Sequence, residues 1–200
     1  MSIVESAKKA FEDLTGRGKP SAKEAKAAVR EVEPKTFMFA DDGAVPNNPE
    51  LPFLVYSRAV ALDPAYDPAA VFEQLFAAHG WGQSWRNGIY DYVHYHSRIH
   101  EVLGIARGSA RVRFGGDNGK ELKLEAGDVA VLPAGTGHQR LSASADLLVV
   151  GAYPPEGEYD ECRGSFTEHG RARRTIPEVP VPKQDPLFGR NGPLTKLWRR

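Results

Sequence analysis

The chain has 200 residues, 41% of them hydrophobic and 26% charged, an ordinary composition for one globular domain with a substantial core. Its 26 basic and 26 acidic residues give a formal net charge of zero, which argues against a nucleic-acid partner because such binders need a basic surplus. The single cysteine excludes an intrachain disulfide, no apolar run is long enough to span a membrane, and the N-terminus lacks the apolar core of a signal peptide. We therefore expect a cytoplasmic protein that meets neither nucleic acid nor membrane.

The N-terminal segment, residues 1–34, is predicted to hold two short helices, over 2–14 and 21–33. Each begins with a capping box, in which a serine is followed three residues later by a glutamate: Ser2 with Glu5, and Ser21 with Glu24. Short amphipathic helices are usually scaffold, so we expect this pair to lie against the main domain or against a partner subunit.

The main domain is predicted over residues 35–153, and it begins with extended segments. Residues 36–39 form an extended piece, and residues 53–62 are apolar enough for a strand at a sheet edge. Asp67 followed by a proline matches a helix N-cap, so we expect a helix over 68–79 that packs against the barrel.

Short strands separated by glycine-rich turns follow that helix, a pattern typical of a β-sandwich or barrel such as a jelly roll. The expected strands are 88–95, 101–106, 110–114, 121–124, 129–132, 138–141 and 147–153. The proline-rich tail over 154–200 carries too many large apolar side chains for a disordered segment. We therefore expect an irregular, extended tail that wraps the barrel and covers its sheet edges.

Histidines and a glutamate occur at strand-like spacing within this β-rich region. His94 and His96 lie two residues apart, so a strand would point both to one face, and Glu101 follows after a short break. His138, in the segment 127–142, offers a fourth ligand. Because these buried groups would be unsatisfied without a shared partner, we predict one divalent metal ion, with a vestigial metal-free site as the alternative. Such nitrogen and oxygen ligands suit Fe, Mn, Ni, Co or Zn alike.

Two motifs in this region resemble those of the cupin superfamily. The first motif, over residues 88–108, reads Gly, five residues, His-x-His, four residues, Glu, six residues and Gly. The second motif, over residues 127–142, reads Gly, five residues, Pro-x-Gly, two residues and His. Ser142 stands where that motif ends in an asparagine. The resemblance implies a mainly β jelly-roll barrel, or double-stranded β-helix, with a metal ion held by His94, His96, Glu101 and His138. The HYHS…HEVLG run and the proline-rich tail further resemble small single-domain bacterial cupins of the YjlB-like kind.

Three further residues are candidates for contact with a bound molecule. His100 would face away from Glu101 on a regular strand, but at a turn near the barrel mouth it is the one nearby candidate for a catalytic base. A solvent-facing turn histidine is the alternative. Tyr92 and Arg140 share strand parity with the histidine ligands, so both are candidates for the substrate pocket, with core packing as the alternative for Tyr92.

A cupin barrel hosts many reactions and does not fix one. The leading hypothesis is a metal-dependent enzyme, a dioxygenase-type oxidoreductase, that acts on a small organic molecule. The alternatives are a metal-dependent isomerase, epimerase or lyase on a sugar-like substrate, with the metal as a Lewis acid, and a non-catalytic protein that binds a small ligand. Zero net charge and exposed sheet edges also predict a homodimer, with residues 35–62 at or near its interface.

Overall fold

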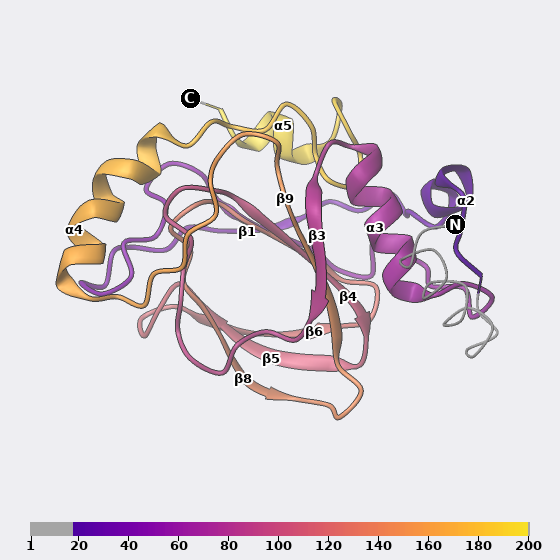
Figure 1. Ribbon diagram of the computed structural model, residues 1–200, viewed down its shortest axis with the longest axis horizontal. Helices are drawn as coiled ribbons and strands as arrows, with labels where there is room; N and C mark the ends of the chain where they lie inside the picture. The colour runs from indigo at the N-terminus through magenta and orange to yellow at the C-terminus, as the bar shows by residue number, and fades with distance from the viewer. Residues whose placement is uncertain (1–17, 200) are drawn as a thin grey trace, which may run out of the picture.

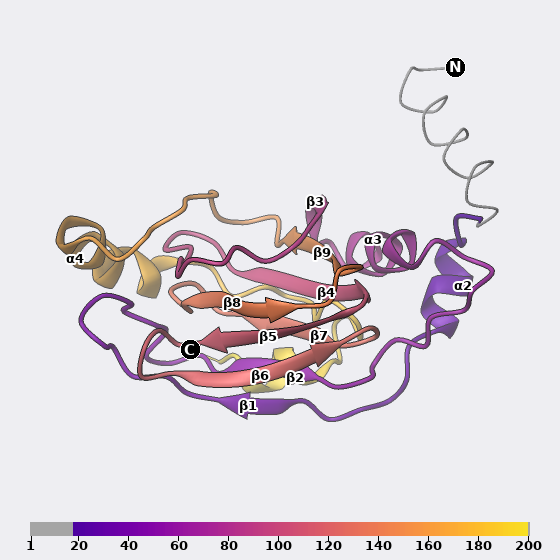
Figure 2. The same cartoon turned by 90° about the horizontal axis from the view of Figure 1, so that it is seen from below.

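Two antiparallel β-sheets face each other across an apolar interior (Figures 1 and 2). The computed structural model describes residues 18–199, so the helix expected over 2–14 lies outside the described residues. The mainly β jelly-roll architecture predicted from the sequence is confirmed.

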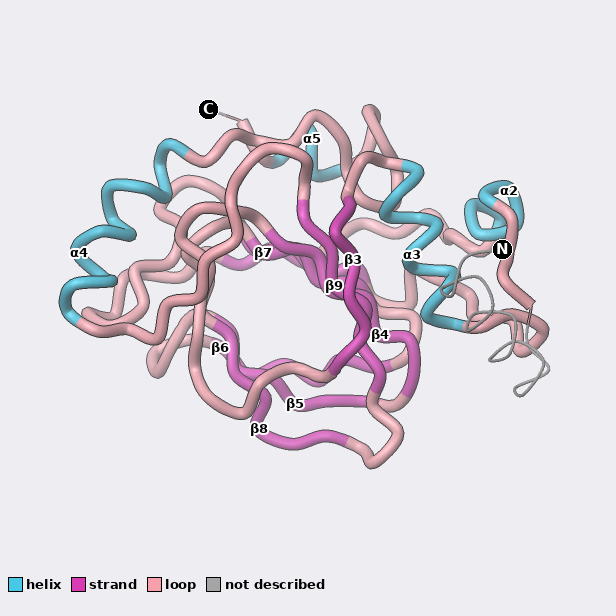
Figure 3. The backbone as a smooth tube through the Cα atoms, in the orientation of Figure 1, coloured by secondary structure: helices cyan, strands magenta, loops and turns pink. Residues whose placement is uncertain are grey.

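Six strands form the larger sheet and three form the smaller one. Figure 3 shows the strands grouped around the centre of the molecule, with helices on the outside. The larger sheet has the order β1 (Lys35–Phe37), β2 (Phe53–Tyr56), β7 (Val129–Leu132), β4 (Glu101–Arg107), β9 (Leu148–Tyr153) and β3 (Gly82–Asn87). The smaller sheet has the order β6 (Lys120–Glu125), β5 (Ser109–Phe114) and β8 (His138–Ala143). Six of these strands, β4 to β9, match strands expected from the sequence to within two residues at each end.

Alternation along β4 gives the larger sheet two buried faces. Leu103 and Ile105 belong to the apolar interior between the sheets. Val102 belongs to a second cluster on the outer face of the sheet, under a helix and the C-terminal tail. The same alternation assigns Glu101 to the interior and His100 to the outer face.

The helix that covers this outer face is α3 (Pro68–Ala78), which follows the predicted bounds closely. Its N-cap is Asp67, whose carboxylate accepts a hydrogen bond from the backbone N–H of Ala69 at 3.2 Å. Phe72 and Phe76 from this helix are buried against the sheet. Gly104 in β4 makes the contact possible, because a β-carbon there would lie 2.4 Å from the Phe72 ring.

The helix α2 (Ala22–Ala27) begins with the predicted capping box but is shorter than the expected helix over 21–33. The chain leaves the helix because its backbone pairs with a neighbouring segment instead. Arg30 donates its backbone N–H to the carbonyl of Ala59 at 2.8 Å, and Ala61 donates to the carbonyl of Ala28 at 2.8 Å.

One predicted strand is absent, and another lies at a different place in the sheet. The chain over 88–95 is not a regular strand, and the polar segment β3 just before it pairs with β9 instead. The apolar segment over 53–62 is not at a sheet edge, because β2 lies between β1 and β7. The edge position belongs to the short strand β1.

The C-terminal tail is more regular than predicted, because it contains α4 (Phe166–Thr175), the short 3-10 helix η1 (Ile176–Glu178) and α5 (Pro193–Leu197). Helix α4 lies at the opposite end of the molecule from α2 (Figures 1 and 2). Leu187, Leu194 and Trp198 are buried in the same cluster as α3 and the outer face of the larger sheet. This part of the tail therefore packs on the outer face of the larger sheet, whereas the sequence led us to expect it over the sheet edges.

Asp185 anchors this tail. Its buried carboxylate accepts hydrogen bonds from the Tyr56 hydroxyl at 2.5 Å and from the backbone N–H groups of Leu187 and Leu194 at 2.8 and 3.1 Å. These donors replace the water that the carboxylate loses on burial, so the turn of the tail is fixed against β2.

Candidate metal centre

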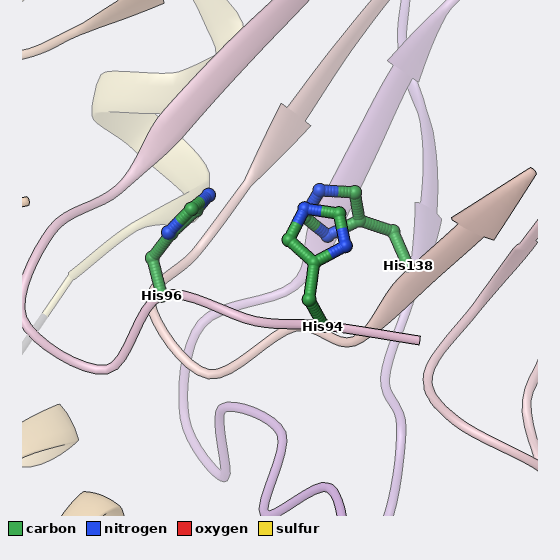
Figure 4. A group of neighbouring side chains, drawn as sticks. All are labelled: His94, His96 and His138. Carbon is green, nitrogen blue, oxygen red and sulfur yellow. The ribbon is translucent and has the colours of Figure 1, made fainter. Parts of the chain in front are cut away.

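Backbone pairing brings His94 beside His138 at the start of β8. The N–H of His94 donates to the carbonyl of His138 at 3.2 Å, and the N–H of His138 donates to the carbonyl of His94 at 2.9 Å. His96 faces the same way two residues on, whereas Tyr95 between them is buried on the other side against Cys162. In Figure 4, His94 and His96 leave one segment and His138 comes from the neighbouring strand.

Gly135 shapes the turn that precedes His138. Its φ is +94°, a left-handed conformation, and a β-carbon there would lie 2.8 Å from the carbonyl oxygen of Asn47. The N–H of Gly135 donates to the carbonyl of His96 at 2.7 Å. The Pro-x-Gly turn of the second motif therefore ties the segment of His96 to the segment of His138.

All three imidazoles face a backbone carbonyl with Nδ1, and a carbonyl can only accept a hydrogen bond. Nδ1 of His94 faces the carbonyl of Tyr92 at 3.4 Å, Nδ1 of His138 faces that of Thr136 at 3.2 Å, and Nδ1 of His96 contacts that of Asp160. The proton is therefore assigned to Nδ1, which leaves the lone pair of Nε2 for a ligand. Metal-binding histidines are usually oriented in this way.

Glu101, at the start of β4, completes the cluster. Its Oε2 lies 3.5 Å from Nε2 of His96 and 3.5 Å from Nε2 of His138. This oxygen is buried and has no hydrogen-bond partner within residues 18–199. The three histidines offer ring nitrogens that lie within 4.8 Å of one another. Donor atoms that share one ion at about 2.0–2.2 Å lie roughly 3–3.5 Å apart, so the two separations measured from Oε2 match those of ligands on one metal ion.

The charges of the cluster favour a cation. Burial, reinforced by His94, lowers the pKa of His138 to about 3, and burial together with His96 lowers the pKa of His94. Burial also disfavours charged His96, but the Glu101 carboxylate outweighs this effect and the pKa of His96 is raised. Burial disfavours ionised Glu101 too, but the imidazoles outweigh it, His96 most strongly, and lower the pKa of the carboxyl. An ionised carboxylate beside imidazoles is what a divalent cation requires.

Tyr153 lies beside Glu101 and is hydrogen-bonded to Trp85. The Tyr153 hydroxyl accepts a hydrogen bond from the Trp85 indole N–H at 2.9 Å. Burial, and next the charge of Glu101, raises the pKa of Tyr153, so its hydroxyl stays protonated beside the carboxylate. Both side chains come from paired strands of the larger sheet, the edge strand β3 and its neighbour β9.

A cavity of about 370 Å³ opens above the cluster. Its lining includes the three histidines and Glu101, together with a wall of aromatic and aliphatic side chains: Trp85, Ile89, Tyr90, Leu103, Tyr153 and Tyr159. Tyr90 and Tyr159 are 43% and 48% exposed, which places them at the rim. The predicted ligand set therefore lies at the floor of a cavity that a small molecule can enter.

The structure does not bring His100 to this cavity. His100 is fully buried on the outer face of the sheet, with its ring 4.8 Å from that of Trp198. Its Nδ1 accepts a hydrogen bond from the backbone N–H of Ala134 at 2.9 Å. The expectation of a turn position at the barrel mouth is wrong, because strand alternation directs His100 away from Glu101.

Tyr92 and Arg140, the two expected pocket residues, do not line the cavity either. The Tyr92 hydroxyl donates to Glu161 at 3.3 Å, and the Arg163 guanidinium lies 4.0 Å from the centre of the Tyr92 ring. Arg140 donates from Nε to the carbonyl of Ile89 at 2.8 Å. Both therefore fix the surrounding chain rather than face a bound molecule.

Sequence reasoning missed Tyr153 and Tyr159. Period-2 alternation in the last strand was a usable signal for Tyr153, since it shares a face with Val149, which lies in the interior. Tyr159 lies in an irregular loop that no local pattern places. Its position follows from Asp160, whose carboxylate accepts hydrogen bonds from the backbone N–H of Ser97 at 2.8 Å and from its hydroxyl at 2.6 Å.

The two facing sheets and the histidine cluster between them define this protein as a cupin. No family model matches the chain. Over 168 residues it is 39% identical to the "Uncharacterized protein YjlB" of Bacillus subtilis (strain 168), a match that covers 84% of this chain and 98% of that protein. The chain therefore belongs to the YjlB family, as its resemblance predicted.

Solved structures with partial similarity include two enzymes. An acireductone dioxygenase from Bacillus anthracis is 18% identical over 43% of this chain and 59% of its own, with a TM-score of 0.33. The QdtA 3,4-ketoisomerase from Thermoanaerobacterium thermosaccharolyticum is 16% identical over 47% of this chain and 74% of its own, with a TM-score of 0.38.

Within residues 18–199, no helix is both long and apolar enough to cross a membrane.

Proposed function

We propose that this chain is a metal-dependent enzyme of the dioxygenase type that acts on a small organic molecule. The observation that carries the proposal is the buried Oε2 of Glu101, which lacks a hydrogen-bond partner in the described chain and faces Nε2 of His96 and of His138 at 3.5 Å each. A divalent cation is the partner that such an arrangement lacks. The metal would be held by His94, His96, Glu101 and His138.

The chain's own residues orient the metal ligands and exclude water from the site. Backbone carbonyls hold each ligand histidine in one tautomer, and Tyr153, hydrogen-bonded to Trp85, lies beside the carboxylate. Aromatic walls exclude water from the floor of the cavity and orient a small ligand above it. When bound, a redox-active ion such as iron or manganese supplies the electron-transfer chemistry toward O₂ that side chains lack.

The alternative of a metal-dependent isomerase, epimerase or lyase has weaker support. Such reactions need a general base near the substrate, and His100 lies outside the cavity. Burial raises the pKa of Tyr153, and it raises the pKa of Tyr159 to about 12, so neither hydroxyl is a good base near neutral pH. Burial also raises the pKa of Cys162 to about 11, which disfavours a thiolate nucleophile.

Metal analysis of protein expressed in unsupplemented medium tests the proposal. The wild-type chain should hold one ion, and Glu101→Gln should lose most of it, because the amide keeps the size of the ligand but removes its charge. His169→Gln is a matched control, because His169 pairs with Asp41 away from the cluster and should leave metal content unchanged. Oxygen uptake is then screened with small organic compounds. Equal metal content in wild type and Glu101→Gln would refute the assignment.

A further inference from the structure

The walls of the cavity fit a flat ring. Trp85, Tyr153 and Tyr159 present aromatic surfaces above the metal ligands. The Tyr159 ring lies 4.9 Å from that of His96 and meets the Tyr153 ring at 5.6 Å with an angle of 71°. Aromatic side chains in such offset and edge-on arrangements attract another planar ring beyond what the buried area alone provides.

The cavity has little to offer a negatively charged group on a ligand. Apart from the imidazoles, the charged side chains in its described lining are Arg86 and Glu101. Arg86 is already paired with two carboxylates. Its Nε and Nη2 donate to the two carboxylate oxygens of Glu73 at 2.8 Å each, and its Nη1 donates to Asp67 at 2.6 Å. A carboxylate or phosphate on the outer part of a ligand would therefore lose water without gaining a cation.

The volume of the cavity and the number of metal ligands further restrict the class of molecule that can bind. At about 370 Å³ the cavity is near the lower end of the range for ligand sites, ~300–1,000 Å³, which suits a molecule with one ring. Three histidines and one glutamate leave two positions of a six-coordinate ion open, and two neighbouring oxygens of one molecule match them.

We propose, on the basis of the metal centre argued above, that the cavity binds a neutral one-ring compound with two adjacent hydroxyl groups, a vicinal diphenol. Its hydroxyl oxygens point to the floor that His94, His96, Glu101 and His138 form. Its ring lies among Trp85, Tyr153 and Tyr159, and its outer edge carries no charge.

Isothermal titration calorimetry under nitrogen on protein loaded with Mn²⁺ tests this assignment, because Mn²⁺ accepts six ligands and leaves the probe intact when O₂ is excluded. The probes are 1,2-dihydroxybenzene, trans-1,2-cyclohexanediol and 3,4-dihydroxybenzoate, which differ in aromaticity or in one carboxylate. The diphenol should bind about tenfold more tightly than the saturated diol, because only the diphenol stacks. It should also bind at least about tenfold more tightly than the benzoate, whose carboxylate has no partner. Equal binding of the saturated diol, or tighter binding of the benzoate, would overturn the inference.

Variants separate this inference from the metal centre itself. In Tyr159→Ala the preference for the aromatic probe should fall by about threefold or more while the manganese content stays unchanged, and Tyr159→Phe should keep both the preference and the metal. Tyr66→Ala is the matched control, since the Tyr66 hydroxyl bonds to Glu24 away from the cavity. Failure of the wild type to bind Mn²⁺ would refute the proposed metal centre. Binding of Mn²⁺ without any preference for the aromatic ring would refute the vicinal diphenol alone.

Discussion

The indole of Trp85 lies directly over the backbone of Gly151, its partner across the β3–β9 pair. A β-carbon on Gly151 would come within 2.1 Å of the indole ring. No real β-carbon approaches another atom so closely, so any larger residue there must move the indole. Because Gly151 has no β-carbon, the Trp85 indole can occupy this place in the cavity wall, where its N–H reaches the Tyr153 hydroxyl.

Gly151→Ala should displace Trp85 and destabilise the fold by roughly 1–3 kcal/mol, the usual effect of overpacking. Urea unfolding measures the loss, and tryptophan emission reports the moved indole. Metal content should persist because no ligand is changed. The control is Gly170→Ala in α4, where nothing lies within 4 Å and an alanine should stabilise the helix slightly. An unchanged midpoint and emission spectrum for Gly151→Ala would contradict the role of the glycine.

The grouping of the candidate ligands was predictable from sequence because two motifs carry them, and the geometry within each motif is local. The spacing of His94 and His96 and the turn around Gly135 are set by backbone rules that a sequence displays. The strand β3 was not predictable, because its residues are mostly exposed and show no apolar alternation. Its place in the sheet depends on Trp85 meeting Gly151, a contact between segments more than sixty residues apart.

Other parts of the site depend on contacts that a linear pattern does not contain. Strand parity did predict that His100 faces away from Glu101, but only the path of the tail places Trp198 over it. Helix α4 carries a capping box at Ser165 and Glu168 that was present in the sequence, yet the surrounding glycines and prolines hid it. Tyr159 lies in the cavity wall only because tertiary contacts of its loop, those of Asp160 with Ser97, place it there.

Metal affinity should fall on acidification, about tenfold for each pH unit below the raised pKa of His96. A metal ion needs the neutral imidazole, and His96 is the ligand whose proton is held most strongly, by Glu101. His138, with a pKa of about 3, should not contribute near neutral pH. Competition with a coloured chelator between pH 5 and 8 measures the slope. A flat profile would contradict the coupling between His96 and Glu101.

In the metal-free protein, His96 should have the opposite effect: acidification should increase the free energy of unfolding. The raised pKa of His96 means that protonation favours the folded state. Its contribution is present below the ordinary histidine value of about 6.5 and is lost as the pH rises through the raised value. Urea unfolding of chelator-treated protein at several pH values measures the effect, with His96→Gln as the comparison.

The homodimer expected from sequence stays a prediction, and the structure identifies the strand to examine. Strand β1 is one edge of the larger sheet, and Met38 just beyond it is 54% exposed. Light scattering after size exclusion should give about twice the chain mass of 21.9 kDa. Met38→Lys should shift the mass toward the monomer if residues 35–62 form the interface. A wild-type mass near 21.9 kDa at micromolar concentration would refute the dimer.

The C-terminal tail should contribute strongly to stability through Trp198. Its ring is buried beside His100, and its indole N–H donates to the carbonyl of Pro52 at 2.8 Å. Trp198→Ala should therefore cost about 3–5 kcal/mol, the usual range for removing a buried aromatic side chain. Leu197→Ala is the matched control, since Leu197 is 40% exposed and should change stability by roughly 0.5 kcal/mol or less.

Truncation after Pro182 extends this test to the whole anchor. It removes Asp185 together with the buried Leu187, Leu194 and Trp198, and so uncovers the outer face of the larger sheet. Each buried apolar side chain stabilises by about 1.5–3 kcal/mol before the ordering cost of the segment is subtracted. The melting temperature of the truncated chain should fall clearly, and the fall should exceed that of Trp198→Ala. A truncated chain that melts like the full chain would show that the tail rests on the barrel without stabilising it.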